Sequence, residues 1–201
     1  MKTLIAAHFF GASNILMLSV YTTSWIGQDV LRGDPDRPAH TLENRLFDLG
    51  VSWGSFALML TSVVVMFTGF VINRMVNKPN KLILKVFFII AQLLAAIGLL
   101  DCAFVYDYSD VFVVLPLTGF AFQTFQIIPE VIADILEKHE KGCAKGDYKQ
   151  LLSFNLFYAQ ALTFVFIPFI FLLFPNISDN LWGILVAGAG GLISAIFALF
   201  V

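Results

Sequence analysis

The chain has 201 residues, of which 59% are apolar and only 13% are charged, and its mean hydropathy is +0.85. Soluble domains carry about 25% charged residues, so this composition excludes a cytosolic enzyme and a secreted disulfide scaffold and indicates an integral membrane protein. The net charge of −2 comes from 14 acidic and 12 basic side chains, with no long basic run to follow a phosphate backbone. Nucleic acid is therefore not an expected partner.

Six apolar stretches follow one another along the chain, each near the roughly 20 residues that a helix needs to cross a bilayer. They cover residues 3–25, 49–72, 82–104, 111–132, 151–174 and 181–201. Turn residues such as Gly33-Asp34-Pro35 and Asn77-Lys78-Pro79 separate them. The sequence therefore predicts an all-α fold, a polytopic membrane bundle of six transmembrane helices that forms a single domain over residues 1–201.

The distribution of lysine and arginine predicts the orientation, because cytoplasmic loops retain positive charge. If the spans alternate, the side that holds the N-terminus has nine basic residues and the other side has three. The nine are Lys2, Arg74, Lys78, Lys81, Lys85, Lys138, Lys141, Lys145 and Lys149, and the three are Arg32, Arg37 and Arg45. We expect both termini in the cytoplasm, an extracytoplasmic loop at 26–48 and a cytoplasmic loop at 133–150. The membrane is either the plasma membrane or an endomembrane.

The fourth span carries a polar stripe on an otherwise apolar helix. Gly119, Gln123, Gln126, Glu130 and Asp134 fall within roughly 60° of one another at the helical period. Polar groups in a bilayer core are costly and normally face a bundle interior or an aqueous cavity. Two interpretations stay open, a solvated pathway lining and interhelical hydrogen bonding. For Glu130, snorkelling to the inner interface is a further alternative.

Other spans add polar or aromatic residues at helical spacing. The candidates for lining a pathway are Asn14, Tyr21, Trp25, Gln28, Ser55, Gln123, Gln126 and Gln160, and Glu130 is the candidate for proton coupling. The alternative for the serines is helix packing. Small residues at every fourth position, Gly50 and Gly54 and then Gly183, Ala187, Gly191 and Ala195, predict close helix approach.

The chemistry-bearing motifs of enzymes are not found in the sequence. His8, His40 and His139 lie far apart and belong to no pattern with metal-ligand spacing. There is no serine elbow, phosphate loop or paired-carboxylate motif. We therefore expect neither an enzyme nor a bound cofactor or metal.

A family resemblance is carried by the first two spans. Its elements are Tyr21-Thr22-Thr23-Ser24-Trp25-Ile26-Gly27-Gln28, the acidic loop Gly33-Asp34-Pro35, and Asp48-Leu49-Gly50-Val51-Ser52-Trp53-Gly54-Ser55. These resemble the seventh and eighth helices of sucrose–proton symporters, a family of the major facilitator superfamily that includes animal membrane-associated transporter proteins. The fourth span, with Gly119, Pro129 and Ala133-Asp134, is similar to the family's tenth helix.

The resemblance implies the C-terminal six-helix half of a twelve-helix transporter. The substrate site of such transporters lies between the two halves. The ligands that the resemblance implies are a sugar and a proton. The implied partners are the lipid bilayer and either a second six-helix half or a second copy. Two departures put proton coupling in doubt, since Ser24 stands where the family has Asp and Ser52 falls near where the plant relatives carry Arg.

Three functions remain open at this point. The first is transport of a sucrose-like sugar by a half-length or incomplete member of the family. The second is a non-transporting membrane protein that assembles with or regulates a transporter. The third is a piece of a longer transporter.

Overall fold

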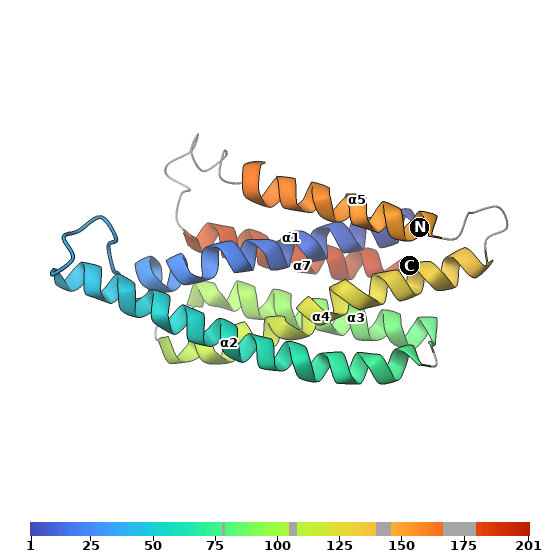
Figure 1. The fold of residues 1–201 in the computed structure, drawn as a ribbon, viewed down its shortest axis with the longest axis horizontal. Helices are drawn as coiled ribbons and strands as arrows, with labels where there is room; N and C mark the ends of the chain where they lie inside the picture. Colours follow the sequence, from blue (N-terminus) through green and yellow to red (C-terminus); the bar gives the residue numbers. More distant parts are fainter. Residues whose placement is uncertain (78, 105–107, 140–145, 167–179) are drawn as a thin grey trace.

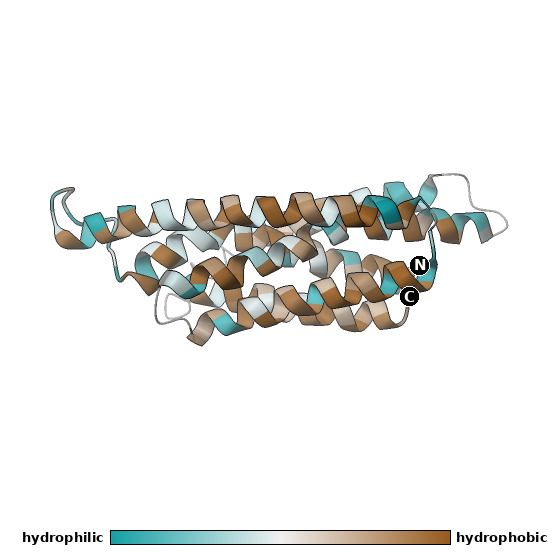
Figure 2. Ribbon diagram, turned by 90° about the horizontal axis from the view of Figure 1, so that it is seen from below, coloured by the Kyte–Doolittle hydropathy of each residue, from teal (hydrophilic) through white to brown (hydrophobic). Residues whose placement is uncertain are grey.

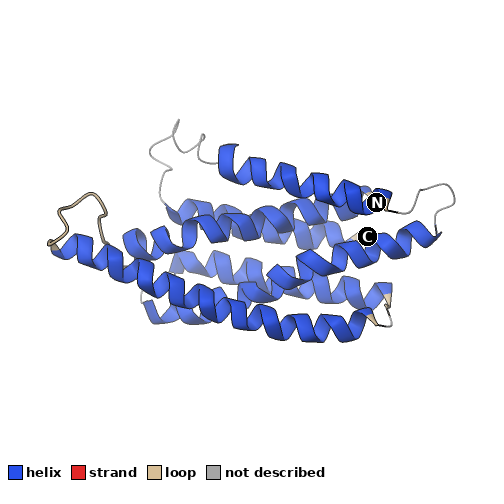
Figure 3. Ribbon diagram, in the orientation of Figure 1, coloured by secondary structure: helices blue, strands red, loops and turns tan. Residues whose placement is uncertain are grey.

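The computed structural model describes residues 1–77, 79–104, 108–139, 146–166 and 180–201, and within them it is helical, with no strand (Figure 3). The elements are α1 (Lys2–Trp25), η1 (Ile26–Val30), α2 (Leu42–Val76), α3 (Lys81–Asp101), η2 (Cys102–Phe104), α4 (Tyr108–His139), α5 (Asp147–Ala161), η3 (Leu162–Phe166) and α7 (Asn180–Leu199). The all-α fold is therefore confirmed for the described part of the chain.

The long helices run side by side as an elongated bundle (Figure 1). The central pair is α1 and α7, and α7 also packs on α3. Helix α4 joins α3 to α2 on one side, whereas α5 lies on the opposite side against α1. Both chain ends lie at the same end of the bundle (Figure 1). Helix α7 therefore packs against both α1 and α3.

Within the described residues, five helices are long and apolar enough to cross a membrane, which identifies an integral membrane protein. They are Lys2–Val30, Leu42–Val76, Lys81–Phe104, Ser109–Lys138 and Asn180–Leu199. Apolar residues dominate their middle parts and hydrophilic residues gather toward the ends (Figure 2). The sixth expected span, 151–174, falls on α5 and η3 and then on residues outside the described part. Six spans therefore stay a prediction.

Helix boundaries differ from the expected ones where caps decide them. Helix α2 begins at Leu42, seven residues before the expected start at 49, because the Thr41 side chain accepts a hydrogen bond from the Asn44 backbone N–H and caps the helix. The expected 26–48 loop is consequently helical at both ends, in η1 and early α2. Within the expected 133–150 loop, α4 continues to His139 and α5 starts at Asp147.

Two apolar clusters fill the bundle. One contains Leu4, Phe88, Phe125, Ile128 and Leu152 from α1, α3, α4 and α5. The other joins Trp25 and Ile26 to Leu99, Leu115 and Ile184, on the opposite half of the bundle. Both clusters draw on α1, α2, α3, α4 and α7, whereas α5 contributes buried residues to the first cluster alone.

Candidate functional site

Helix α5 carries polar residues on both its inner and its outer face. Its inner face buries Leu152, Asn155 and Ala159 against the rest of the bundle. The side-chain amide of Asn155 donates to the Ile5 carbonyl oxygen at 2.8 Å and lies 3.1 Å from His8 Nδ1. A polar side chain thus docks α5 on α1, in contrast to the purely apolar packing of most of the core.

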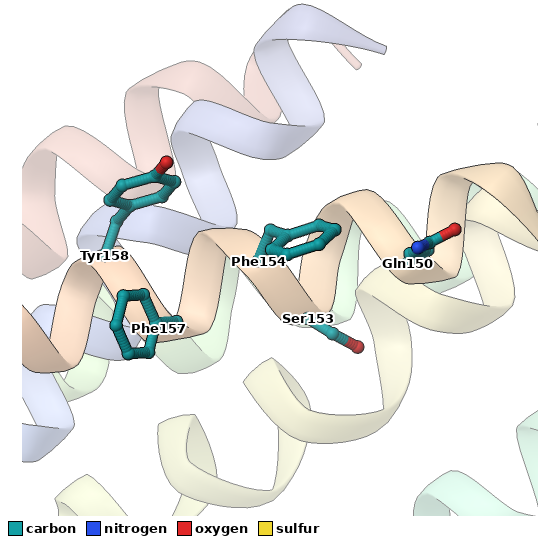
Figure 4. A pocket seen from close by; sticks show the side chains of 5 residues that line it. All are labelled: Gln150, Ser153, Phe154, Phe157 and Tyr158. Atoms are coloured by element: carbon teal, nitrogen blue, oxygen red, sulfur yellow. The ribbon is translucent and has the colours of Figure 1, made fainter.

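The outer face of α5 forms a groove of about 470 Å³ (Figure 4). Its lining residues are Gln150, Ser153, Phe154, Phe157 and Tyr158. The Phe157 and Tyr158 rings meet edge to face, with centroids 6.0 Å apart. Aromatic faces beside an amide and hydroxyl groups suit a ligand that has both an apolar face and a polar edge.

The groove lies next to the carboxylates of α4, because the end of α4 holds the start of α5. Lys149 forms an ion pair with Asp134 at 3.0 Å. The Glu137 carboxylate accepts backbone N–H groups of Gly146 at 3.0 Å and Tyr148 at 2.7 Å. A carboxylate at a helix N-terminus is favoured by the unsatisfied N–H groups and the helix dipole. These contacts fix the register between α4 and α5.

The charge around Lys149 is predominantly negative. The hydrogen bond to Asp134 raises the pKa of Lys149 above its ordinary value; burial opposes this rise, and attraction to Asp134, Glu130 and Glu137 adds to it. Both partners of the ion pair are more than two-fifths exposed. Lys149 therefore stays charged at neutral pH and neutralises part of the negative charge on α4, and it is not a candidate proton carrier.

His8 lies buried where α1, α4 and α5 meet. Its ring is 5.7 Å from that of Phe125 on α4, centroid to centroid, and its Nδ1 faces the Asn155 amide. An ionisable side chain held inside a membrane bundle is by default a functional candidate. Sequence reasoning considered His8 only as a possible metal ligand, since nothing in the local pattern announces a partner 147 residues away.

The expected pathway residues of α1 divide into buried and exposed ones. Asn14, Tyr21 and Trp25 are buried, and Asn14 and Tyr21 face α7, where they lie against the backbone of Gly191 and Gly183. Gln28 is exposed in η1, where its side-chain oxygen accepts a hydrogen bond from Asn180 at the start of α7. These residues therefore tie α1 to α7 and do not share one open surface.

The expected residues of the remaining helices lie at the surface or between helices. Gln123 is half-buried and approaches Gly69 of α2, whereas Gln126 and Glu130 are exposed. Gln160 of α5 is exposed, and Ser55 of α2 is exposed with its hydroxyl donating to the Val51 carbonyl in its own helix. The α4 stripe thus begins at the α2 interface and continues onto the surface.

A buried pair of amides was only half anticipated. Asn14 and Gln92 are fully enclosed, and neither side chain has a hydrogen-bond partner among the described residues. Both line the seam between α1, α3 and α7, where Gly11 lies near Gln92 and Gly191 lies against Asn14. The sequence does distinguish Gln92, because it is the lone amide in the apolar run 82–104.

The described residues contain no group of histidine, cysteine, aspartate and glutamate side chains able to hold a metal ion. The lining of the groove consists of aromatic, amide and hydroxyl groups.

Comparison with known proteins relates part of the chain to sugar transporters. It is 39% identical over 59 residues to the sucrose transport protein SUT2 of Oryza sativa subsp. indica, which is 29% of this chain and 11% of that protein. It is 31% identical over 90 residues to the sucrose transport protein SUT1 of Oryza sativa subsp. japonica, 45% of this chain and 16% of that protein. The matches therefore cover less than a fifth of each relative, and no protein-family model matches the chain.

Proposed function

We propose that this protein takes part in moving a sucrose-like sugar across a membrane, with its helices forming one wall of the sugar path. In this role the chain corresponds to a six-helix half of a transporter with both termini in the cytoplasm. The reaction is alternating access around a site shared with a second half or a second copy, and no bond is made or broken.

The observation that carries the proposal is the outer face of α5. Helix α5 and η3 lie alongside the helices that are long and apolar enough to cross a membrane. The exposed face of α5 combines the Gln160 amide and the Ser153 hydroxyl with the rings of Phe154, Phe157 and Tyr158, and an amide is costly against lipid. A path that carries a polar solute supplies the surroundings that this face needs.

The chemistry of the α5 groove fits a sugar ring. The C–H faces of a sugar ring stack on aromatic rings, here Phe157 and Tyr158, and its hydroxyls exchange hydrogen bonds with amides and hydroxyls, here Gln150 and Ser153. Gln126 and Glu130 on the adjoining surface of α4 extend the same polar surface. The residues proposed to line the path are thus Ser55, Gln123, Gln126, Gln160 and, at its α1 edge, Gln28.

A second function, assembly with or regulation of a transporter without transport, has its own support. By the resemblance to the symporters, Ser24 stands where that family has Asp and Ser52 falls near where the plant relatives carry Arg, which weakens the case for proton-driven transport. Under this alternative the α5 groove is a protein contact and binds no sugar.

Binding of radiolabelled sucrose to the purified chain in nanodiscs tests the proposal. Saturable binding that Phe157→Leu weakens about tenfold or more supports a sugar site, because stacking on an aromatic face would be lost. Phe70→Leu on α2 is the matched control, since Phe70 and Phe157 are 64% and 65% exposed. Absence of saturable binding, or an equal effect of both variants, counts against the sugar site and favours the protein-contact alternative.

A further inference from the structure

The hydrogen bonds at His8 define its protonation state. An amide NH₂ group only donates, so His8 Nδ1, which faces Asn155 Nδ2 at 3.1 Å, must accept. The orientation of the Asn155 amide is itself fixed, because Nδ2 also donates to the Ile5 carbonyl oxygen at 2.8 Å. Turning the amide over would place its oxygen against that carbonyl. His8 is therefore neutral here, with its proton on Nε2.

Protonation of His8 is incompatible with this arrangement. A proton on Nδ1 would set one donor against another, at Asn155 Nδ2. If Asn155 turns so that Oδ1 accepts from Nδ1, the hydrogen bond from Nδ2 to Ile5 is lost. Either way, at least one of the two polar contacts between α1 and α5 breaks when His8 binds a proton.

No counter-charge stands ready for a charged His8 in the described structure. Asn155 is its one described hydrogen-bond partner, and α7 has no ionisable side chain. The ionisable side chains on the other elements around it are exposed or engaged elsewhere. In the half of the bundle that holds His8 they are Lys2 on α1, Glu130, Asp134, Glu137 and Lys138 on α4, and Asp147, Tyr148, Lys149 and Tyr158 on α5. An imidazolium in this apolar junction is costly unless water reaches it.

We propose that His8 is a proton-binding site and that its protonation releases α5 from α1. The lost hydrogen bond and the unpaired charge act in the same direction, because both are relieved when α5 moves away and water enters. The part of this proposal in which the proton on His8 is coupled to transport rests on the proposed transport function. The protonation-dependent release of α5 needs no sugar and is tested by itself.

The position of α5 against the central helices can be measured by pulsed electron spin resonance. Spin labels are placed on two exposed residues, Leu151 of α5 and Ile196 of α7, in the full chain with Cys102→Ser and Cys143→Ser, in nanodiscs. Between about pH 8 and about pH 4, a range that spans the titration of histidine, a longer-distance population should appear.

Two histidine variants separate His8 from general effects of acid. In His8→Asn the new side chain cannot bind a proton, while its Oδ1 can accept from Asn155, so the longer-distance population should be lost. His40→Asn, in an exposed loop, should retain it. A parent chain without the pH-dependent population, or a His8→Asn chain that keeps it, overturns the proposal. Asn155→Leu should show the longer distance at both pH values, and a short distance at both also overturns it.

Nitrogen NMR keeps the proposal testable if His8→Asn fails to fold. With His40→Asn and His139→Asn, His8 is the one remaining histidine and its ring nitrogens can be labelled selectively. We expect the Nε2–H tautomer at about pH 8 and an imidazolium at low pH, in parallel with the distance change. A ring that stays neutral while the distance changes overturns the proposal. Loss of sucrose binding at every pH with the distance change intact would instead overturn the transport function and leave the proton site standing.

Discussion

Gly50 at the start of the membrane part of α2 lies directly against Gly27 of η1, backbone to backbone. A Cβ on Gly50 would lie 2.7 Å from the Gly27 nitrogen, closer than real Cβ atoms approach, and 3.0 Å from the Ile26 carbonyl carbon. The close helix approach that the small-residue spacing predicted is therefore confirmed here. Because both contacts are backbone atoms, no side-chain rotation can relieve the crowding.

Gly50→Ala should accordingly destabilise the protein by about 1–3 kcal/mol, the usual cost of overpacking. Gly190→Ala on α7 is the matched control, since a Cβ there meets just the Phe10 carbonyl oxygen at 3.4 Å. Helix propensity favours alanine over glycine by up to about 1 kcal/mol, so the control should be neutral or stabilising. Thermal unfolding in detergent measures the stability of both variants. Equal stability of the two would contradict the backbone contact between Gly50 and Gly27.

The sequence predicted the helices better than their rotation about their own axes. Long apolar runs define the spans of α1 to α4, because crossing a bilayer demands them. Apart from the α4 stripe, polar residues are few in these runs, so periodicity could not show that Asn14 turns toward Gly191 or that Gln92 is enclosed. Those orientations depend on which neighbour packs there, here α7, whose contribution comes from residues almost 180 positions away.

The candidate site shows the same division. Gln126, Gln160 and Glu130 were found from the sequence because amides and carboxylates in apolar runs stand out. The pairing of His8 with Asn155 was missed, because it depends on α5 docking across α1. The aromatic residues of the α5 groove were missed as well, since Phe157 is one of 22 phenylalanines and composition gives it no distinction.

The carboxylate of Glu137 should stabilise the first turn of α5. Glu137→Ala removes the acceptor for the Gly146 and Tyr148 N–H groups and should cost about 1–2 kcal/mol, as loss of a helix cap does. Hydrogen–deuterium exchange should accelerate at the start of α5 before it does elsewhere. Glu137→Gln, which keeps an acceptor, should show a smaller effect, and Lys138→Ala, at an exposed neighbour, none. Unchanged exchange in Glu137→Ala would exclude the cap.

The ion pair between Asp134 and Lys149 should give a small pH-dependent contribution to stability. Because the folded-state pKa of Lys149 is raised, its contribution is present below the unfolded pKa of about 10.4 and is lost as the pH rises through the folded value. The pair is largely exposed, so about 0.5 kcal/mol is expected at neutral pH. Asp134→Asn should therefore be less stable than the parent at neutral pH, and the two should become equally stable once the pH exceeds the raised folded-state pKa of Lys149. A difference that persists at high pH would have another cause.

Cysteine labelling should test the proposed orientation. In a Cys102→Ser and Cys143→Ser background, we expect Ser109→Cys at the start of α4 to react with a membrane-impermeant reagent from the outside. Lys138→Cys at the other end of α4 should react only after the cytoplasmic side is opened. The excess of basic residues near Lys138 is the reason for this assignment. Labelling of Ser109→Cys from the cytoplasmic side would contradict the proposed orientation.

The isolated chain should not catalyse proton-coupled sugar uptake. Coupling requires that solute and proton each favour the same conformational change, and alternating access rocks one half of a transporter against another around a midplane site. The proposed path has one wall here, the α4 and α5 surface with Gln126, Glu130 and the α5 groove, and nothing in the described structure closes it. Ser24 further stands where the symporter pattern has its acid.

Whether the isolated chain transports sugar can be measured as uptake of radiolabelled sucrose into liposomes that contain only the purified chain, with and without an inward proton gradient. We expect uptake equal to that of empty liposomes under both conditions, even where sucrose binding in nanodiscs is saturable, because binding needs one wall and transport needs two. Uptake that saturates and rises with the gradient would show that two copies rebuild the path. In that case the Gly183 to Ala195 stripe of α7 would not be the contact between copies, since its small residues already face Tyr21 and Asn14 of the same chain. The exposed face of α5 would be the surface that the second copy shares.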